Sequence, residues 1–175
     1  DDANVEVVLE QDKEALLFML EEEKLARDTY EFLGEIWGLN QFSNIKKSEQ
    51  SHMSAIETLL KKYDIAYEIL EEGIFNNTDL QAIYNTFKVD GVKSQVDALK
   101  IGATIEDLDI NDLEDFISKT DNVQIINIYR NLQCGSRNHL RSFMKGIDAK
   151  GGTYTPQFIS FEEFNNIVNS SQEQC

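Results

Sequence analysis

The stretch DKEALLFMLEEEKLARDTYEFLGEIW, residues 12–37, decides the fold class of this protein. One set of positions recurs at alternating steps of four and three residues, which keeps one face of a helix turned toward a core. This inner row consists of Leu16, Leu20, Glu23, Arg27, Tyr30, Gly34 and Trp37. Gly38 follows directly and is typical of a helix end. The stretch therefore predicts one long amphipathic helix over about residues 12–37.

Two further segments have the same helical period. The second predicted helix begins at Ser43, an N-cap candidate. Its inner row consists of Ile45, Glu49, His52, Ile56, Leu59 and Tyr63. The third predicted helix covers about residues 94–119, and its Asp- and Asn-rich residues 109–112 are a candidate kink or break. Its inner row consists of Leu99, Gly102, Glu106, Asp109, Leu113 and Ile117.

A fourth long helix is predicted over about residues 123–145, ended by Gly146. Its inner row consists of Ile125, Tyr129, Leu132, Ser136, His139 and Phe143. Two short helices complete the pattern, each with a predicted capping box. The boxes pair Thr78 with Gln81 inside the connection of residues 64–92, and Ser160 with Glu163 before a helix that ends at Val168.

This order of elements predicts an all-α fold. Two helices joined by a short turn, a long crossover that carries a short helix, and two more helices form a ferritin-like four-helix bundle. A short C-terminal helix is added to it. We expect a single ferritin-like domain over residues 1–175, with a bundle core at about 12–146 and a C-terminal extension at 147–175.

The composition excludes several classes of protein. The 175 residues include 16 basic and 32 acidic side chains, a formal net charge of −16, which argues against nucleic-acid binding. A hydrophobic content of 41% argues against disorder. No apolar run approaches the roughly 20 residues of a membrane helix, so a soluble protein is expected. The chain begins at Asp1, so both a cytoplasmic location and an extracytoplasmic one after signal-peptide removal remain open.

Each long inner row is interrupted near its middle by polar or ionisable residues. These are Glu23, Glu49, His52, Glu106, Asp109, Ser136 and His139. Buried carboxylates are costly unless they are paired or bind a metal. Four carboxylates match the charge of two divalent cations, and mixed carboxylate and imidazole ligands suit iron or manganese, with zinc as a competitor. A buried polar network without metal is the alternative.

Spacing and local sequence extend this interpretation. Residues three apart share a helix face, so Glu49 and His52 aim at one point. The segment Glu23-Lys-Leu-Ala-Arg-Asp-Thr-Tyr30 resembles the first ligand helix of rubrerythrins and ferritins, and Glu49-Gln-Ser-His52 resembles their second-helix motif. Glu106-x-x-Asp109 is similar to the third-helix Glu-x-x-Glu of rubrerythrins. The resemblance, over about residues 16–145, implies metal ligands at Glu23, Glu49, His52, Glu106, Asp109 and His139.

The sequence departs from that family in two places. The fourth helix has Ser136-Arg-Asn-His139 where the family has Glu-x-x-His, so one bridging carboxylate is missing. Asp109 is the candidate replacement, although it also suits the cap of a helical segment beginning near Asn111. The rubredoxin-like Cys-x-x-Cys module of rubrerythrins is absent, so peroxidase activity would need an external electron donor.

Several neighbours have less certain roles. Glu22 competes with Glu23 as a ligand, although the run Glu21-Glu22-Glu23 is typical of a solvated face. We expect supporting roles for Tyr30, Arg27 and Ser136 around the ligands, with Arg27 neutralising a carboxylate or reaching the surface. Arg137 and Arg141 are interpreted as solvated. Cys134 is interpreted as a packed thiol, and Cys175 as free to pair with it or with another chain.

The leading functional hypothesis is a di-iron oxidoreductase in which Fe(II) reacts with O₂ or peroxide. The alternatives are a metal-binding or sequestration protein without turnover and a degenerate bundle that serves as an interaction module. No nucleic acid and no membrane are expected as partners, and a homodimer is compatible with this type of bundle.

Overall fold

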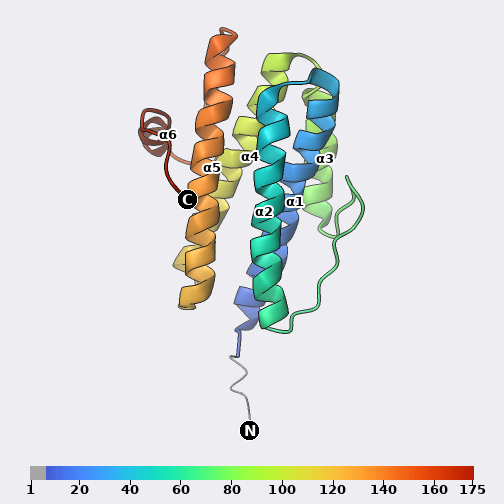
Figure 1. Cartoon of the computed structure of the whole chain (residues 1–175), viewed down its shortest axis with the longest axis vertical. Helices are drawn as coiled ribbons and strands as arrows, with labels where there is room; N and C mark the ends of the chain where they lie inside the picture. Colours follow the sequence, from blue (N-terminus) through green and yellow to red (C-terminus); the bar gives the residue numbers. More distant parts are fainter. Residues whose placement is uncertain (1–6) are drawn as a thin grey trace.

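The structure, a computed structural model, describes residues 7–175. The described part of the chain contains six helices and no strand, which confirms the all-α prediction (Figure 1). The helices are α1 (Glu10–Trp37), α2 (Asn40–Lys62), α3 (Thr78–Asp90), α4 (Gln95–Ser118), α5 (Val123–Ala149) and α6 (Phe161–Val168). Over residues 7–175, no helix combines the length and apolarity needed to span a membrane.

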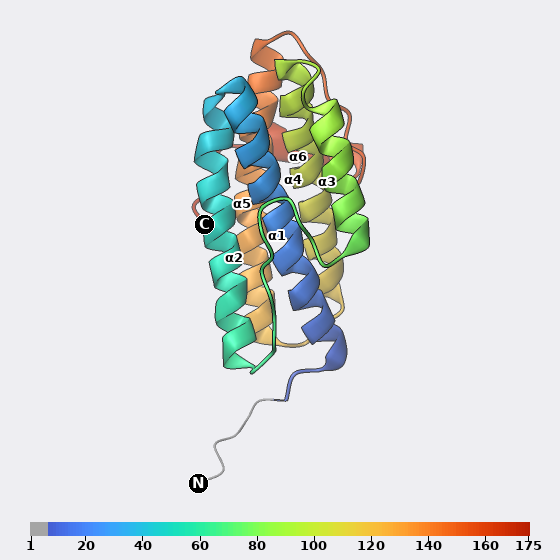
Figure 2. The same cartoon turned by 90° about the vertical axis from the view of Figure 1, so that its right-hand side faces the viewer.

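The four long helices form a bundle with one long connection, as predicted. α1 packs closely on α2 and α4 packs closely on α5, each as an antiparallel pair. α2 and α4 run in the same direction, because the crossover returns the chain along the bundle before α4 begins (Figure 2). α3 lies within this crossover and packs against α1 and α4. The bundle therefore has the order of helix directions that a ferritin-like plan requires.

A buried ion pair on α1 attaches the crossover to the bundle. Lys24 is 2% exposed, and its Nζ lies 2.5 Å from Oδ2 of Asp28. The same ammonium donates to the backbone carbonyls of Glu71 and Ile74, both at 2.9 Å, and lies 4.2 Å from the centre of the Phe75 ring. Because every donor of the buried cation has a partner, Lys24 holds the crossover at little net electrostatic cost.

The C-terminal extension is attached by one buried carboxylate. Asp107 of α4 accepts hydrogen bonds from the backbone N–H groups of Gln157, Phe158 and Ile159. The hydroxyl of Tyr154 donates to the same carboxylate at 2.7 Å. This cluster of donors turns the chain toward α6, which packs against α5.

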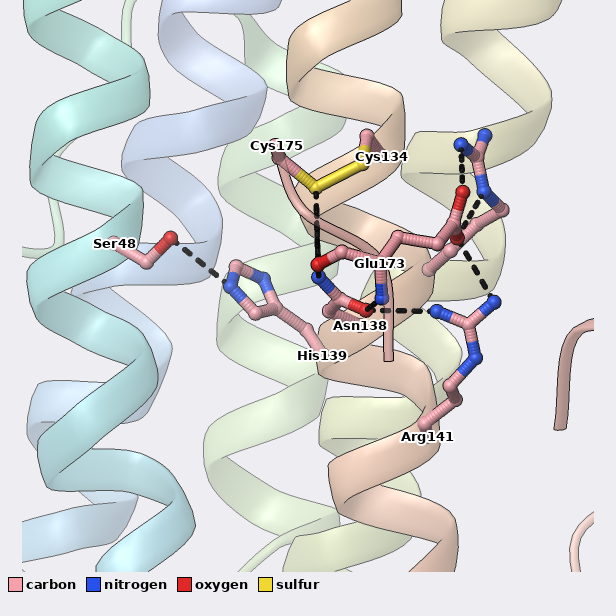
Figure 3. Close-up of a disulfide and its surroundings, with 8 residues drawn as sticks. Ser48, Cys134, Asn138, His139, Arg141, Glu173 and Cys175 are labelled. Atoms are coloured by element: carbon pink, nitrogen blue, oxygen red, sulfur yellow. Dashed lines mark hydrogen bonds and ion pairs between the residues drawn. A yellow bond between two sulfur atoms is a disulfide. The ribbon is translucent and has the colours of Figure 1, made fainter. Parts of the chain in front are cut away.

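The final residues return to α5 and end in a disulfide between Cys134 and Cys175. The interpretation of Cys134 as a packed thiol is therefore wrong, and of the two pairings considered the intramolecular one is present. Arg141 is buried rather than solvated, and Arg137 is half-buried; both bind the carboxylate of Glu173 near the chain end. Figure 3 shows this carboxylate beside the disulfide. The acidic residue of the tail explains why two cations lie on this side of α5.

Two predicted caps are wrong and one is confirmed. α2 begins before Ser43, whose hydroxyl donates to the carbonyl of Asn40 inside the first turn. α3 is capped by Asn77, which accepts from two backbone N–H groups, so the predicted box at Thr78 is not formed. Ser160 does cap α6, accepting from the N–H of Glu163 at 3.1 Å. Asx and serine side chains compete for such positions, and neighbouring contacts decide between them.

The Gln81 side chain of the predicted box serves the loop before α3 instead. Its Oε1 accepts from the N–H of Phe75 at 3.0 Å, and its Nε2 donates to the carbonyl of Gly73 at 2.9 Å. Gln81 therefore fixes the loop rather than the helix end, a role that only the folded path of the crossover makes available.

The candidate kink in the third long helix is also wrong. α4 continues without interruption through residues 109–112, because Asp109 finds its hydrogen-bond partner on another helix rather than on its own backbone. α5 likewise passes through Gly146 and ends at Ala149. A Cβ at Gly146 would lie 2.7 Å from Nε2 of Gln41, so this glycine permits a close approach of α2 rather than a stop.

Candidate metal centre

A polar layer divides the bundle core into two apolar clusters. One cluster contains Leu25, Tyr30, Ile105 and Phe143, and the other contains Leu20, Met53 and Leu132, among further residues. The ionisable residues of the inner rows lie between them. They come from all four long helices and are 0–9% exposed: Glu23, Glu49, His52, Glu106, Asp109, Ser136 and His139. The helical period thus brings the predicted residues to one level.

Five of the six predicted ligands form two groups that share Glu49. The first group is Glu23, Glu49 and His52, and the second is Glu49, Glu106 and His139. Within each group one potential ligand atom per residue lies within 4.8 Å of the others, which is the spacing of a metal-binding site. Both groups are capable of holding a metal ion.

The two histidines present equivalent atoms to the carboxylates. Nδ1 of His52 lies 3.1 Å from Oε2 of Glu23 and 3.2 Å from Oε2 of Glu49. Nδ1 of His139 lies 2.8 Å from Oε1 of Glu49 and 3.2 Å from Oε1 of Glu106. Each imidazole therefore faces a terminal carboxylate and one oxygen of Glu49, so Glu49 occupies a bridging position between two nearly symmetric half-sites.

Many of the carboxylate oxygens in this layer have no hydrogen-bond donor. Seven such buried oxygens accept no hydrogen bond from residues 7–175. They are both oxygens of Glu22, both oxygens of Glu49, and one oxygen each of Glu23, Glu106 and Asp109. A buried acceptor without a hydrogen bond costs free energy. Seven such acceptors in one layer therefore indicate a ligand that supplies positive charge. A pair of divalent cations fits this donor set.

Neighbouring groups orient the candidate ligands. The hydroxyl of Tyr30 donates to Oε1 of Glu106 at 2.9 Å, which places Tyr30 where the sequence interpretation put it. Nε2 of His139 lies 3.0 Å from Oγ of Ser48, a contact that leaves Nδ1 directed at the carboxylates. Such contacts to the outer nitrogen of a histidine are typical of metal sites. Sequence reasoning missed Ser48, although it comes directly before Glu49.

Gly135 makes room for the other histidine. A Cβ at this position would lie 2.6 Å from Nε2 of His52, closer than side chains approach one another. The glycine on α5 therefore allows the imidazole to lie against the helix backbone. Only the packing of α2 on α5 reveals this role, because a single glycine within a helix has several explanations.

The charges of the centre shift several pKa values. Burial alone would lower the pKa of His52, but the charges of Glu23 and Glu49 outweigh it and raise the pKa to about 12. In the same way Glu106 and Glu49 overcome burial and raise the pKa of His139 to about 10. Burial and the charge of Glu49 raise the pKa of Glu23 to about 7. Without metal, the two imidazoles therefore hold protons that partly neutralise the carboxylates.

Asp109 lies outside both groups of candidate ligands, beside Glu22. It accepts a hydrogen bond from Oγ of Ser136 at 3.0 Å, and burial with the charge of Glu23 raises its pKa well above the usual range. Its helix-cap role is excluded, because it lies in the middle of α4. The expectation of a solvated Glu22 is wrong: it is fully buried, and burial with the charge of Asp109 raises its pKa. Burial and neighbouring charges therefore disfavour the ionised form of both carboxyls.

The structure places Arg27 away from its predicted role. Its Nε lies 3.1 Å from Oδ1 of Asp28, and its Nη1 donates to Oε1 of Gln50 at 2.7 Å. The partly exposed guanidinium thus contacts the residues around the crossover anchor. The histidines of the centre take over the neutralising role that the sequence interpretation gave to Arg27.

Comparison with known proteins places this architecture in a family. A sequence model of the family described as "Uncharacterized protein domain (DUF2202)" matches residues 12–171. The chain belongs to the DUF2202 family. The matched range includes α1 from its third residue, all of α2, α4 and α5, the crossover, α6 and every candidate ligand.

Two further similarities extend over nearly the whole chain. It is 50% identical over 169 residues to "Uncharacterized protein MJ0754" of Methanocaldococcus jannaschii, covering 95% of this chain and 91% of the relative. The crystal structure of hypothetical protein MJ0754 from Methanococcus jannaschii DSM 2661 is similar with a TM-score of 0.94 and 48% identity. The match covers 99% of this chain and 100% of that one. The DUF2202 bundle is therefore shared with a protein whose structure has been solved.

Proposed function

We propose that this DUF2202 protein is a ferritin-like di-metal oxidoreductase that binds two iron ions and reacts Fe(II) with O₂ or peroxide. The unpaired carboxylate oxygens of the polar layer carry this proposal, because two cations would satisfy them. Manganese and zinc would compete for the same ligands. The resemblance of the ligand helices to rubrerythrins and ferritins supports iron and redox chemistry.

The chain's residues divide the work of holding two ions. Glu23 and His52 would hold one ion, Glu106 and His139 the other, and Glu49 would contact both. Bound Fe(II) would supply electrons and open coordination positions. Tyr30 keeps Glu106 oriented, Ser48 keeps His139 oriented, and the apolar clusters on both sides limit access of water. Asp109, which accepts a hydrogen bond from Ser136, would be available as a sixth ligand next to the centre.

The test is an anaerobic titration with Fe(II), followed by measurement of O₂ and peroxide consumption above the rate of the same amount of free iron. We expect two iron ions per chain and faster consumption than free iron. The variant Glu49→Gln should lose both, while Glu31→Gln, which changes an ion pair with Lys46 outside the centre, should keep both. Absence of bound transition metal would instead indicate a bundle that serves only as an interaction module.

One observation favours a second candidate function, metal sequestration without turnover. Ser136 stands where the related families have a bridging carboxylate, and its hydroxyl donates to Asp109 rather than binding an ion. A centre with one bridge would hold its two ions unequally. Stoichiometric iron binding without O₂ or peroxide consumption would favour this function.

A further inference from the structure

The disulfide between Cys134 and Cys175 lies along the part of α5 that carries His139 (Figure 3). We propose that these cysteines are a redox-active pair that transfers electrons from an external thiol to the metal centre. The inference rests on the proposed di-metal function and deepens it, because it names the chemical class of the electron donor.

Each cysteine is connected to a histidine of the candidate centre through a neighbouring residue of α5. Cys134 precedes Gly135, whose backbone on α5 lies against His52: a Cβ there would be 2.6 Å from Nε2 of the imidazole. Sγ of Cys175 accepts from Nδ2 of Asn138 at 3.4 Å, and Asn138 precedes His139. Figure 3 shows the disulfide, Asn138 and His139 along the same part of α5. One peptide bond therefore links Cys134 to the glycine that lies against His52, and one links Asn138 to His139.

The pair is open to an external reductant. Cys134 is half-buried, whereas Cys175 is exposed at the end of the chain. Neither cysteine belongs to an apolar cluster of the core. Because thiol–disulfide exchange requires a thiolate to reach one sulfur in line, exposure of Cys175 makes its sulfur the accessible point of attack. Opening the bond would leave the bundle core unchanged.

Ion pairs keep the tail in place independently of the disulfide. The carboxylate of Glu173 accepts from Nε and Nη2 of Arg137 and from Nη2 of Arg141, all at 2.8 Å. The backbone N–H of Glu173 donates to Oδ1 of Asn138 at 2.9 Å. Hydrogen bonds from Arg137 and Arg141 lower the pKa of Glu173 to about 2, so the ion pairs persist at neutral pH. The reduced cysteines would thus stay close together, which favours repeated closing of the bond.

The electron balance closes with peroxide as oxidant and a thiol as reductant. Peroxide would accept one electron from each of two bound Fe(II) ions and two protons from solvent, so that its O–O bond would break and two waters would form. The two protein thiols then release two protons and two electrons and form one S–S bond, while two Fe(III) ions each gain one electron. Two external thiols exchange with this disulfide, become joined to each other, and return their protons to the protein cysteines.

The test follows iron and thiols in the same sample. The protein is reduced with dithiothreitol, freed of reductant without oxygen, loaded with Fe(II), and given one peroxide per two irons. Fe(III) absorbance is followed with time, and free thiols are counted by iodoacetamide labelling and intact mass. We expect Fe(III) to decay as both thiols disappear. In Cys175→Ser, which changes only an exposed terminal side chain, Fe(III) should decay about tenfold more slowly. Cys134→Ser should behave in the same way.

Five outcomes decide between these possibilities. Loss of thiols together with Fe(III) in the wild type, and persistence of Fe(III) in both serine variants, would support the inference. Equal decay of Fe(III) in wild type and Cys175→Ser would overturn it. Equally rapid thiol loss in metal-free protein given peroxide would also overturn it, because the metal would not be the acceptor. Iron that is bound and oxidised without thiol loss overturns this inference alone, whereas a wild type that binds no iron overturns the proposed function as well.

Discussion

Asp107 on α4 and Glu49 on α2 are both fully buried carboxylates, but their oxygens have opposite surroundings. Asp107 accepts from the backbone of Gln157 at 2.5 Å and of Ile159 at 2.8 Å, and from the hydroxyl of Tyr154. The two oxygens of Glu49 receive no backbone N–H or hydroxyl donor from the described residues, and they face the imidazoles of His52 and His139 instead. Burial of charge by itself therefore does not distinguish a structural anchor from a ligand site.

The cations of the crossover anchor and of the candidate metal centre differ in the same way. Lys24 satisfies all its donors with Asp28 and two backbone carbonyls, so the crossover anchor is complete within the protein. The metal centre contains only histidines as potential cations, and these must lose their protons before they bind a metal. The distinguishing feature is the unpaired acceptor: a complete network stabilises the fold, and an incomplete one leaves a place for an ion.

The largest expected effect is at the shared ligand. Glu49→Gln keeps the shape of the side chain but removes the charge between the two half-sites, so metal affinity should fall by about a thousandfold. The metal-free protein should be less stable than the wild type: burial and Glu106 would raise the pKa of Glu49, but the charges of His139 and His52 outweigh them and lower it, so the variant removes a charge that pairs with both imidazoles. Equilibrium dialysis with Fe(II) or Mn(II) and circular dichroism measure the two effects. Full metal occupancy in the variant would show that Glu49 is not a metal ligand.

The matching change in the structural anchor should have the opposite profile. Asp107→Asn exchanges one acceptor oxygen for a donor facing the N–H groups of Gln157 to Ile159, which should cost about 3 kcal/mol of unfolding free energy. Metal stoichiometry should remain that of the wild type. Urea unfolding of the metal-free protein and metal analysis separate the two readouts. A variant that stayed stable but lost its metal would contradict the distinction between the Asp107 anchor and the candidate metal centre.

Metal binding should weaken as the pH falls. The carboxylates of the centre hold the pKa of His52 at about 12 and that of His139 at about 10, so both are protonated in metal-free protein at neutral pH. A metal must displace these protons, and each released proton makes affinity fall about tenfold per unit decrease in pH. Because each ion has one histidine ligand, the combined affinity for two ions should fall about a hundredfold per unit decrease in pH. Chelator competition over a pH series measures the slope.

A control variant sharpens this pH test. His52→Gln removes one titrating ligand, so the slope should decrease by the contribution of one proton while the sign stays the same. A wild-type affinity that does not depend on pH would mean that the imidazoles do not exchange protons for metal.

The smallest effect concerns the missing carboxylate. Ser136 is buried next to Asp109 and lies one helical turn from His139, so Ser136→Glu should bind the second ion about tenfold more tightly. Asp109→Ala should weaken the binding of that ion by a similar factor, and the double variant should bind it about as tightly as the wild type. Metal titrations of the four proteins provide the comparison. Loss of metal in Ser136→Glu would mean that this position does not accept a carboxylate.

The predicted ligands lie in one layer because of a regular helical period, which is a property of the sequence. Glu23, Glu49 and Glu106 needed no tertiary information to be assigned to inward-facing rows. Glu22 was misjudged because adjacent residues on an isolated helix point to different sides. In the bundle α1 contacts α2 and α4 as well as α3, so the faces of Glu22 and Glu23 are both covered.

Local periodicity is enough to predict the all-α class, the four long helices, the crossover between them and the level of the polar layer. The position of Glu49 in both groups and the hydrogen bond from Ser136 to Asp109 depend instead on how the helices pack together. The tertiary structure also decided that Cys175 returns to Cys134 across 41 residues of sequence. Hydrogen-bond and disulfide partners come from distant segments, and their choice depends on the packing of whole helices rather than on the residues beside them.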